Sequence, residues 1–356
     1  MNRISKETVA SMDKSGMLQK ILEFPSQLLR GWEIGEEVQV GVDLGRFRNI
    51  VFGGMGGSAI AGDVVRSLLG DGFPVPLLVN RGYRLPGFVD SRTLFVASSY
   101  SGNTEETLTA TQEAKEKGCT VVCVTSGGRL GEMAEENGWS LFRLPSGYPP
   151  RAALGYSLGV MLHFFRRLGV GEVAQEDLKQ TITFLEKTGK AWGQIENSDN
   201  LALILAREIR GKIPLIYSSV EGLDGVGFRW KTQLNENGKT HAFYQPFPEM
   251  NHNEIVGWEC LPGTDVFFRH FIMVVLRIPE DSPRIRLRMD TTKQLVEKSG
   301  GRVLEVMGEG SSFLARLLYL IYLGDLLSFY LAILYEVDPT EIQKIDRLKK
   351  ALSEHS

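Results

Sequence analysis

The feature of this chain that most restricts its fold is a regular alternation of short apolar runs with longer helical patterns from Arg46 onward. Short apolar runs bounded by turn residues are typical of buried strands, and the segments between them are long enough to be crossover helices. Strands and helices that alternate in this way form a parallel sheet covered by helices. The sequence therefore predicts an α/β protein.

Two such series are visible, and they predict two doubly wound, mostly parallel sheets. The first series contains expected strands at 49–53, 76–79, 93–98, 120–125 and 140–143, with expected helices at 58–69 and 104–117. The second series contains expected strands at 213–217, 265–276 and 303–307. We divide the chain into an N-terminal helical segment (1–30), a first domain (31–170), a linking helix (171–200), a second domain (201–337) and a C-terminal helix (338–356).

One segment, 313–337, is apolar for long enough to cross a membrane. Arg316, Asp325 and Glu336 interrupt it, and each would cost roughly 2.5 to 3.5 kcal/mol at the centre of a bilayer. We therefore expect a buried core helix and not a membrane span.

Composition restricts the partners and the compartment. The 40 basic residues nearly balance the 43 acidic ones, so the chain has no strong positive field for nucleic acid or an anionic membrane. Cys119, Cys123 and Cys260 are an odd number of cysteines without metal-ligand spacing, and residues 1–20 lack the apolar stretch of a signal peptide. We expect a cytoplasmic protein with no metal, no organic cofactor, no nucleic-acid partner and no membrane association.

A glycine-rich turn, Gly53-Gly54-Met55-Gly56-Gly57-Ser58, joins the first strand to a helix. Free N–H groups and the helix dipole make such a turn an anion site, to which Ser58 adds a hydroxyl. The same glycines fit the GxGxxA pattern of a dinucleotide-binding oxidoreductase. The acidic ribose ligand is missing after the second strand, however, and only Arg81 would support NADP. A tight turn without a ligand is a third interpretation.

A serine-rich loop follows the expected strand at 93–98. Ser99, Ser101 and Thr104 place hydroxyls at the start of the next helix, where main-chain N–H groups also point. A phosphate monoester presents several acceptor oxygens that such neutral donors can satisfy. The alternative is a plain helix cap at Thr104, but Thr107 stands where a capping box needs Glu or Gln. We favour a phosphate site.

The glycine-rich turn with its continuation to Asp63 and the segment Ser99-Tyr100-Ser101-Gly102-Asn103-Thr104 together resemble the sugar isomerase (SIS) domain. In that domain, serines and a threonine bind the phosphate of a phosphosugar. The resemblance identifies a domain and leaves its activity open, because some SIS proteins only sense their ligand.

Two polar segments, 228–237 and 248–254, lie among apolar residues and indicate a site in the second half of the chain. Aldose–ketose isomerisation needs a base that carries a proton between C1 and C2, a group that assists ring opening, and a positive charge for the enediolate. Glu236, His252 and Arg151 can supply these functions. Glu254 and His241 compete with them, and a lone Glu or His is more often a structural group.

These segments resemble the bifunctional phosphoglucose/phosphomannose isomerases over most of the chain after Gly53. Three blocks match in order: Gly-Gly-Ser-Ala-Ile with the downstream Asp63, Ser-Tyr-Ser-Gly-Asn-Thr, and Leu-Asn-Glu-Asn followed by Asn-His-Asn-Glu-Ile-Val-Gly-Trp. The resemblance implies two SIS-type domains and interconversion of glucose 6-phosphate or mannose 6-phosphate with fructose 6-phosphate through a cis-enediol. A non-catalytic phosphosugar-binding SIS protein and an NADP-dependent oxidoreductase are the alternatives.

The same resemblance assigns roles to individual residues. It implies that Glu236 transfers the proton, His252 opens the sugar ring and Arg151 stabilises the enediolate. It also implies a homodimer with a shared active site, so that His252 serves the partner's site. The implied substrate-binding residues, most of them for the phosphate, are Gly57, Ser58, Ser99, Ser101, Thr104, Thr340 and Arg347, with Lys344 as an alternative to Arg347 on the tail helix.

Overall fold

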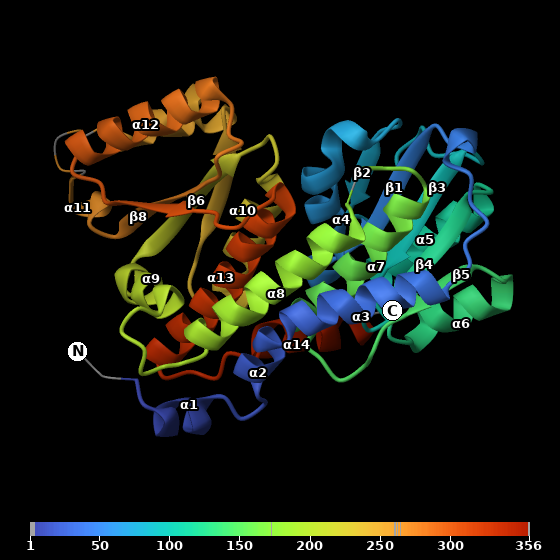
Figure 1. The fold of residues 1–356 in the computed structure, drawn as a ribbon, viewed down its shortest axis with the longest axis horizontal. Helices are drawn as coiled ribbons and strands as arrows, with labels where there is room; N and C mark the ends of the chain where they lie inside the picture. Colours follow the sequence, from blue (N-terminus) through green and yellow to red (C-terminus); the bar gives the residue numbers. More distant parts are fainter. Residues whose placement is uncertain (1–3, 172, 260, 262, 264, 355–356) are drawn as a thin grey trace.

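Two parallel β-sheets form the centres of two lobes in the computed structural model, which describes residues 4–354 except residues 172, 260, 262 and 264 (Figure 1). Sheet A has the strand order β2-β1-β3-β4-β5, and all its pairings are parallel. Its strands are β1 Asn49–Gly54, β2 Leu77–Asn80, β3 Thr93–Ser98, β4 Thr120–Thr125 and β5 Ser140–Arg143. The prediction of an α/β fold with a parallel sheet is confirmed.

Among the described residues, sheet B repeats the order of the first four strands of sheet A, as β7-β6-β8-β9. Its strands are β6 Ile213–Ser219, β7 Phe243–Phe247, β8 Phe271–Arg277 and β9 Val303–Met307. The strand that we expected over 265–276 is wrong in its first half, where helix α11 (Asp265–Phe268) stands. The polar pair Arg269-His270 separates two apolar runs there, so a helix and a strand share what the sequence presents as one strand.

Helices cover both sheets. Helix α4 (Gly56–Leu69) follows β1, and α10 (Asp224–Glu236) follows β6, so the two helices hold the same place in their domains. The other α-helices are α1 Lys6–Met12, α2 Met17–Leu22, α3 Phe24–Glu37, α5 Glu105–Glu116, α6 Gly128–Asn137, α7 Leu154–Arg167, α8 Gln175–Trp192, α9 Leu201–Ile209, α12 Pro283–Lys298, α13 Phe313–Leu334 and α14 Gln343–Ser353. Short 3-10 helices are η1 Leu44–Arg46, η2 Gly70–Gly72, η3 Pro150–Ala152, η4 Glu249–His252 and η5 Glu254–Trp258.

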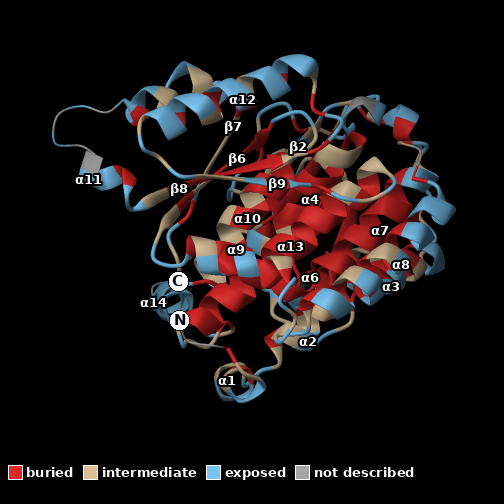
Figure 2. Cartoon of the chain, turned by 60° about the vertical axis from the view of Figure 1, so that its left-hand side comes forward, coloured by how far each residue is buried: buried red, intermediate tan, exposed pale blue. Residues whose placement is uncertain are grey.

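Helix α13 is the core of the molecule, and Figure 2 shows it buried between the lobes. By length and composition it could cross a membrane, but its most apolar 18-residue stretch is fully buried within the protein. Its carboxylate, Asp325, is 3% exposed and pairs with Arg229 at 2.6 Å. The expectation of a buried core helix is confirmed.

The N-terminal residues pack on the body of the same chain, because α3 lies unusually close to α7. A Cβ atom on Gly31 would lie 2.2 Å from the carbonyl oxygen of Tyr156, and one on Gly159 would lie 2.3 Å from that of Leu28. Only glycine permits this approach of two helix backbones. Helix α3 crosses residue 30, where we placed the end of the N-terminal segment, and the domain limits remain a prediction.

Candidate functional site

The proposed phosphate-binding segments meet at the carboxyl edge of sheet A, where the strand order reverses between β1 and β3. Ligands of open parallel sheets bind at such a switch point. The Tyr100 main-chain N–H donates to Ser58 Oγ at 2.9 Å, and Ser98 Oγ donates to the Ser58 carbonyl at 3.2 Å. The turn after β1 and the loop after β3 therefore form one structure.

Within the loop after β3, the Thr104 side chain does not cap the helix that begins after it. Thr104 holds the N-cap position of α5, but its Oγ1 lies 2.9 Å from Ser99 Oγ instead of bonding the helix N–H groups. Ser99 Oγ also accepts from the Gly102 N–H at 3.1 Å, and Ser101 Oγ accepts from the Asn103 N–H at 3.3 Å. Three hydroxyls thus line the start of α5 without serving as its cap, which supports the anion site over plain capping.

Gly57 connects this loop region to the arginine that we expect at the reacting carbons. A Cβ atom on Gly57 would lie 3.0 Å from the Pro150 carbonyl and 3.1 Å from the Arg151 Cα. The first turn of α4 therefore contacts η3, the short helix that carries Arg151. A side chain at position 57 would push these two elements apart.

Arg151 lies against the end of α10 with its guanidinium almost completely fixed. Its Nε donates to Asn237 Oδ1 at 2.6 Å, and its Nη2 donates to the carbonyls of Pro339 and Thr340 at 2.9 and 2.8 Å. The remaining nitrogen, Nη1, lies 3.6 Å from Glu236 Oε2. The Arg151 side chain is 3% exposed and that of Glu236 is 26% exposed, so the carboxylate is the member of the pair that a ligand can reach.

Burial lowers the pKa of Arg151 from its usual value, and the carboxylates of Glu236 and Asp338 act against this change. Arginine keeps its charge because its usual pKa is above 12. A cation in this position can stabilise negative charge that develops beside Glu236.

A buried polar network, which we did not predict, holds Arg151 from behind. Arg229 Nη2 donates to the Arg151 carbonyl at 2.9 Å, and its Nε and Nη2 bond both Asp325 oxygens at 2.9 and 2.6 Å. Gln233 donates to the same carboxylate at 2.9 Å, and Asn237 donates to Ser328 Oγ at 3.0 Å. The signal available in the sequence was Asp325 in an apolar helix, which we treated only as an argument against a membrane span.

The structure brings together Gly57, Ser58, Ser99, Ser101, Thr104, Arg151, Glu236 and Thr340 through the contacts above, but it does not bring His252 or Arg347 to them. Helix α10 begins after the carboxyl end of β6 and ends before the amino end of β7, whereas His252 follows the carboxyl end of β7. Glu236 and His252 therefore lie toward opposite edges of sheet B, separated by about 20 Å of helix. Lys344 and Arg347 are both exposed on α14, and among the described residues no hydrogen bond or ion pair joins either to Glu236 or Arg151.

Arg81, the residue on which an NADP interpretation depends, already has partners. It forms an ion pair with the buried Asp63, and its guanidinium lies 5.0 Å from the centre of the Phe228 ring. Burial raises the pKa of Asp63, and the charge of Arg81 acts against this change. Arg81 thus joins α4 to α10, and a bound 2′-phosphate would have to compete with Asp63 for it.

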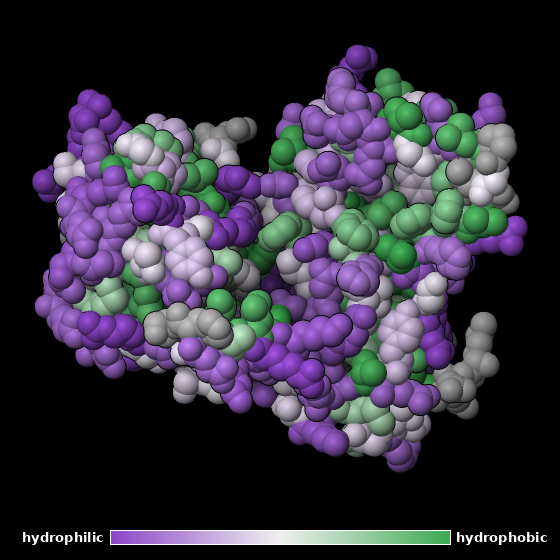
Figure 3. All heavy atoms as spheres, turned by 180° about the vertical axis from the view of Figure 1, so that it is seen from behind, coloured by the Kyte–Doolittle hydropathy of each residue, from purple (hydrophilic) through white to green (hydrophobic). Residues whose placement is uncertain are grey.

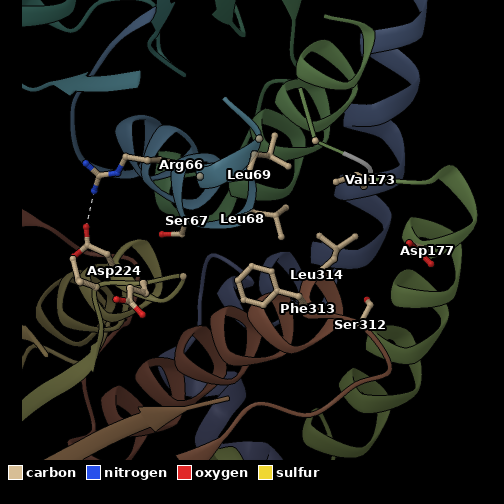
Figure 4. A pocket seen from close by; sticks show the side chains of 16 residues that line it. Arg66, Ser67, Leu68, Leu69, Val173, Asp177, Asp224, Ser312, Phe313 and Leu314 are labelled. Atoms are coloured by element: carbon tan, nitrogen blue, oxygen red, sulfur yellow. Dashed lines mark hydrogen bonds and ion pairs between the residues drawn. The ribbon is translucent and has the colours of Figure 1, made fainter. Parts of the chain in front are cut away.

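A large pocket among the described residues lies elsewhere. It is about 990 Å³ in volume and lies at the opposite ends of α4 and α10 from Gly57 and Glu236 (Figure 4). Among the described lining residues, the charged ones are the carboxylates Asp177, Glu221 and Asp224 and one cation, Arg66, which Asp224 already binds at 2.6 Å. This acidic lining does not suit a phosphate. Figure 3, from the opposite face, shows a hollow between the two lobes with polar and apolar side chains around it.

Known proteins resemble this chain in sequence and in fold. A family model described as the bacterial phospho-glucose isomerase C-terminal SIS domain matches residues 198–352. A bifunctional phosphoglucose/phosphomannose isomerase from Caldicellulosiruptor bescii is 41% identical over 339 residues, which cover 95% of this chain and 99% of that protein. A protein of the same description from Aquifex aeolicus is 38% identical over 319 residues, with 88% and 93% covered. A solved structure of a hypothetical protein from Thermus thermophilus has a TM-score of 0.72 at 18% identity and covers 98% of this chain and 92% of that one.

The paired parallel sheets and the hydroxyl-lined loop define a protein of the SIS class, as the family model indicates independently for the second half. Within that class the identity and coverage of the relatives decide the assignment. The chain belongs to the bifunctional phosphoglucose/phosphomannose isomerase family.

Proposed function

We propose that this chain interconverts fructose 6-phosphate with glucose 6-phosphate and mannose 6-phosphate through a cis-enediol. The observation that carries the proposal is the pairing of a reachable carboxylate, Glu236, with a fixed guanidinium, Arg151, 3.6 Å away. The loop of Ser99, Ser101 and Thr104 adjoins this pair through the contact of Gly57 with η3. The family of the chain and the chemistry of the site support the same reaction.

In the proposed mechanism each residue acts on a stated atom. The hydroxyls and N–H groups around the start of α5 bind the phosphate and set the distance to the reacting carbons. Glu236 removes a proton from C1 or C2 and returns it to the neighbouring carbon, and Arg151 Nη1 stabilises the negative oxygen of the enediolate. Thr340 borders the space at C2, where the two aldose products differ.

Proton transfer through an enediol predicts exchange with solvent. When fructose 6-phosphate is brought to equilibrium in D₂O, deuterium is expected at C2 of both aldoses after repeated turnovers, because the Glu236 carboxyl exchanges its proton with water. Proton NMR of the products measures this directly. Products that remain fully protiated at equilibrium would indicate a hydride shift and contradict the role of Glu236.

We propose in addition a cytoplasmic homodimer in which His252 opens the sugar ring in the partner's site. This proposal is supported by the exposure of His252 on η4, far from Glu236, and by the surface around it. Exposed apolar side chains mark an interface where they gather in one patch. The segment that follows His252 exposes Val256, Leu261, Val266 and Phe267. Helix α14, which has no buried residue, presents a second apolar row of Ile345, Leu348 and Leu352.

A shared site has a quantitative consequence for mixtures of inactive variants. Glu236→Gln and His252→Ala should each be inactive alone, whereas equal amounts refolded together should recover about one quarter of the wild-type activity. Half of the dimers in a random mixture are mixed, and each mixed dimer has one site with both residues intact. No recovery, with mixed dimers demonstrated by mass spectrometry, would show that His252 acts within its own chain, and activity of His252→Ala alone would show that it has no part in the reaction.

A further inference from the structure

Lys239 lies two residues after Asn237, the end cap of α10, and its ammonium joins that helix to the chain beyond α13. Its Nζ donates to the Glu236 carbonyl at 2.6 Å, to the Glu341 carbonyl at 2.6 Å and to the Pro339 carbonyl at 3.2 Å. All three acceptors are main-chain carbonyls, and one belongs to the proposed proton-transfer residue itself. We refer to residues 338–341 as the C-terminal turn.

The C-terminal turn is bound from two sides by cations. Arg151 donates to the carbonyls of Pro339 and Thr340, so Pro339 is shared between Arg151 and Lys239. The Asp338 carboxylate accepts from the Thr340 N–H at 2.7 Å and gives the turn its shape. Thr340, which borders the space at C2, is thus located by Lys239 and Arg151 together.

The backbone at Lys239 is in a conformation that a lysine rarely adopts. Its φ is +51°, and among the described residues only Glu336 shares a positive φ without being glycine. Such a conformation costs on the order of 1 kcal/mol and persists only where other contacts hold it. Gly238 precedes it, and a glycine at 239 would meet no backbone penalty. Its three hydrogen bonds therefore hold the lysine in this conformation against its local preference.

The charges around Lys239 make its ammonium sensitive to pH. Lys239 as a residue is exposed, but shielding of the ammonium end from water, followed by the repulsion of Arg151, lowers its pKa to about 8. The carboxylates of Asp338, Glu236 and Glu341 act in the opposite direction. Because the pKa is lowered, the charged form that binds three carbonyls is complete well below pH 8 and is lost as the pH rises above it.

We propose that Lys239 is a positioning residue for the isomerisation, holding the C-terminal turn and Arg151 in register with Glu236. This inference rests on the function proposed above for Glu236 and Arg151. Lys239 contacts no reacting atom in this account, and its effect passes through the Glu236 main chain and through the turn that carries Thr340. Among the described residues, the acceptors of the Lys239 ammonium do not include a residue of the loop of Ser99, Ser101 and Thr104, so phosphate binding should not depend on Lys239.

The test compares Lys239→Gly and Lys239→Arg with a matched control, Lys20→Met. Lys20 is another lysine whose ammonium donates to a main-chain carbonyl, that of Ser15 at 2.8 Å, and it lies in the N-terminal helices. Glycine at position 239 keeps the backbone conformation, so Lys239→Gly should unfold at a temperature close to that of the wild type. Its kcat should fall at least about tenfold, with little change in KM for fructose 6-phosphate. Lys20→Met should leave kcat and KM unchanged.

The pH profile separates positioning from a general structural role. The kcat of the wild type should decline above about pH 8. Lys239→Arg should have most of the wild-type kcat and should not show this decline, because arginine stays charged. A kcat of Lys239→Gly equal to that of the wild type, or an alkaline decline in Lys239→Arg like that of the wild type, would overturn the inference. If Glu236→Gln is itself active, the proposed site fails instead, so the two failures are distinguishable.

Discussion

Replacing Glu236 by Gln is expected to lower kcat in both directions by about 10²- to 10⁴-fold, the usual contribution of a general base. The amide has nearly the same shape, so its neighbour Arg151 should keep its three hydrogen bonds to Asn237, Pro339 and Thr340. KM for fructose 6-phosphate should change little, because the loop of Ser99, Ser101 and Thr104, where we propose that the phosphate binds, is untouched. Steady-state kinetics measure both quantities.

Glu254→Gln is the control for this substitution. Glu254 accepts a hydrogen bond from the Tyr217 hydroxyl at 2.6 Å, and it follows the carboxyl end of β7, away from Arg151. We interpret it as a structural carboxylate, so its amide should retain most of the activity. A variant pair in which Glu254→Gln is inactive and Glu236→Gln is active would transfer the role of the base to Glu254.

Asp325→Leu is expected to have the largest effect on stability, lowering the free energy of unfolding by about 3 to 5 kcal/mol. The substitution leaves the buried Arg229 guanidinium without its carboxylate and removes the acceptor of Gln233. Burial raises the pKa of Asp325, and its bonds to Arg229 act against this change. Each of the two buried charges therefore depends on the other for its compensation. Urea unfolding followed by circular dichroism measures the loss.

The double variant Asp325→Leu with Arg229→Met separates stability from activity. Replacing both charges by apolar side chains of similar size should restore most of the stability, since buried ion pairs are often no better than well-packed apolar residues. Activity should stay low, because the bond from Arg229 to the Arg151 carbonyl is absent. Restoration of both properties would show that this network does not position Arg151.

The parts of the fold that the sequence predicted well are those set by local pattern. The strands of sheet A are short apolar runs with clear turn residues, and their expected limits differ from the structure by one residue at most. The strand expected over 265–276 was wrong because an apolar run has the same appearance in a short helix and in a buried strand.

The candidate site also has a part that local sequence pattern predicts and a part that it does not. Ser99 and Thr104 could be predicted because one loop supplies them, whereas the position of Arg151 depends on contacts with residues 86 and 188 positions away. The separation of His252 from Glu236 follows from the direction of α10 relative to β7, which single-sequence patterns do not show. Lys239 and Arg229 donate hydrogen bonds to main-chain carbonyls, and no sequence motif marks such contacts.

The most direct test of the central claim is a coupled assay of the purified protein with fructose 6-phosphate in the presence of EDTA, following glucose 6-phosphate and mannose 6-phosphate separately. The account predicts that both aldoses form and that both activities disappear together in Glu236→Gln. Binding of the phosphosugar without formation of either aldose would contradict it and would indicate a non-catalytic SIS protein.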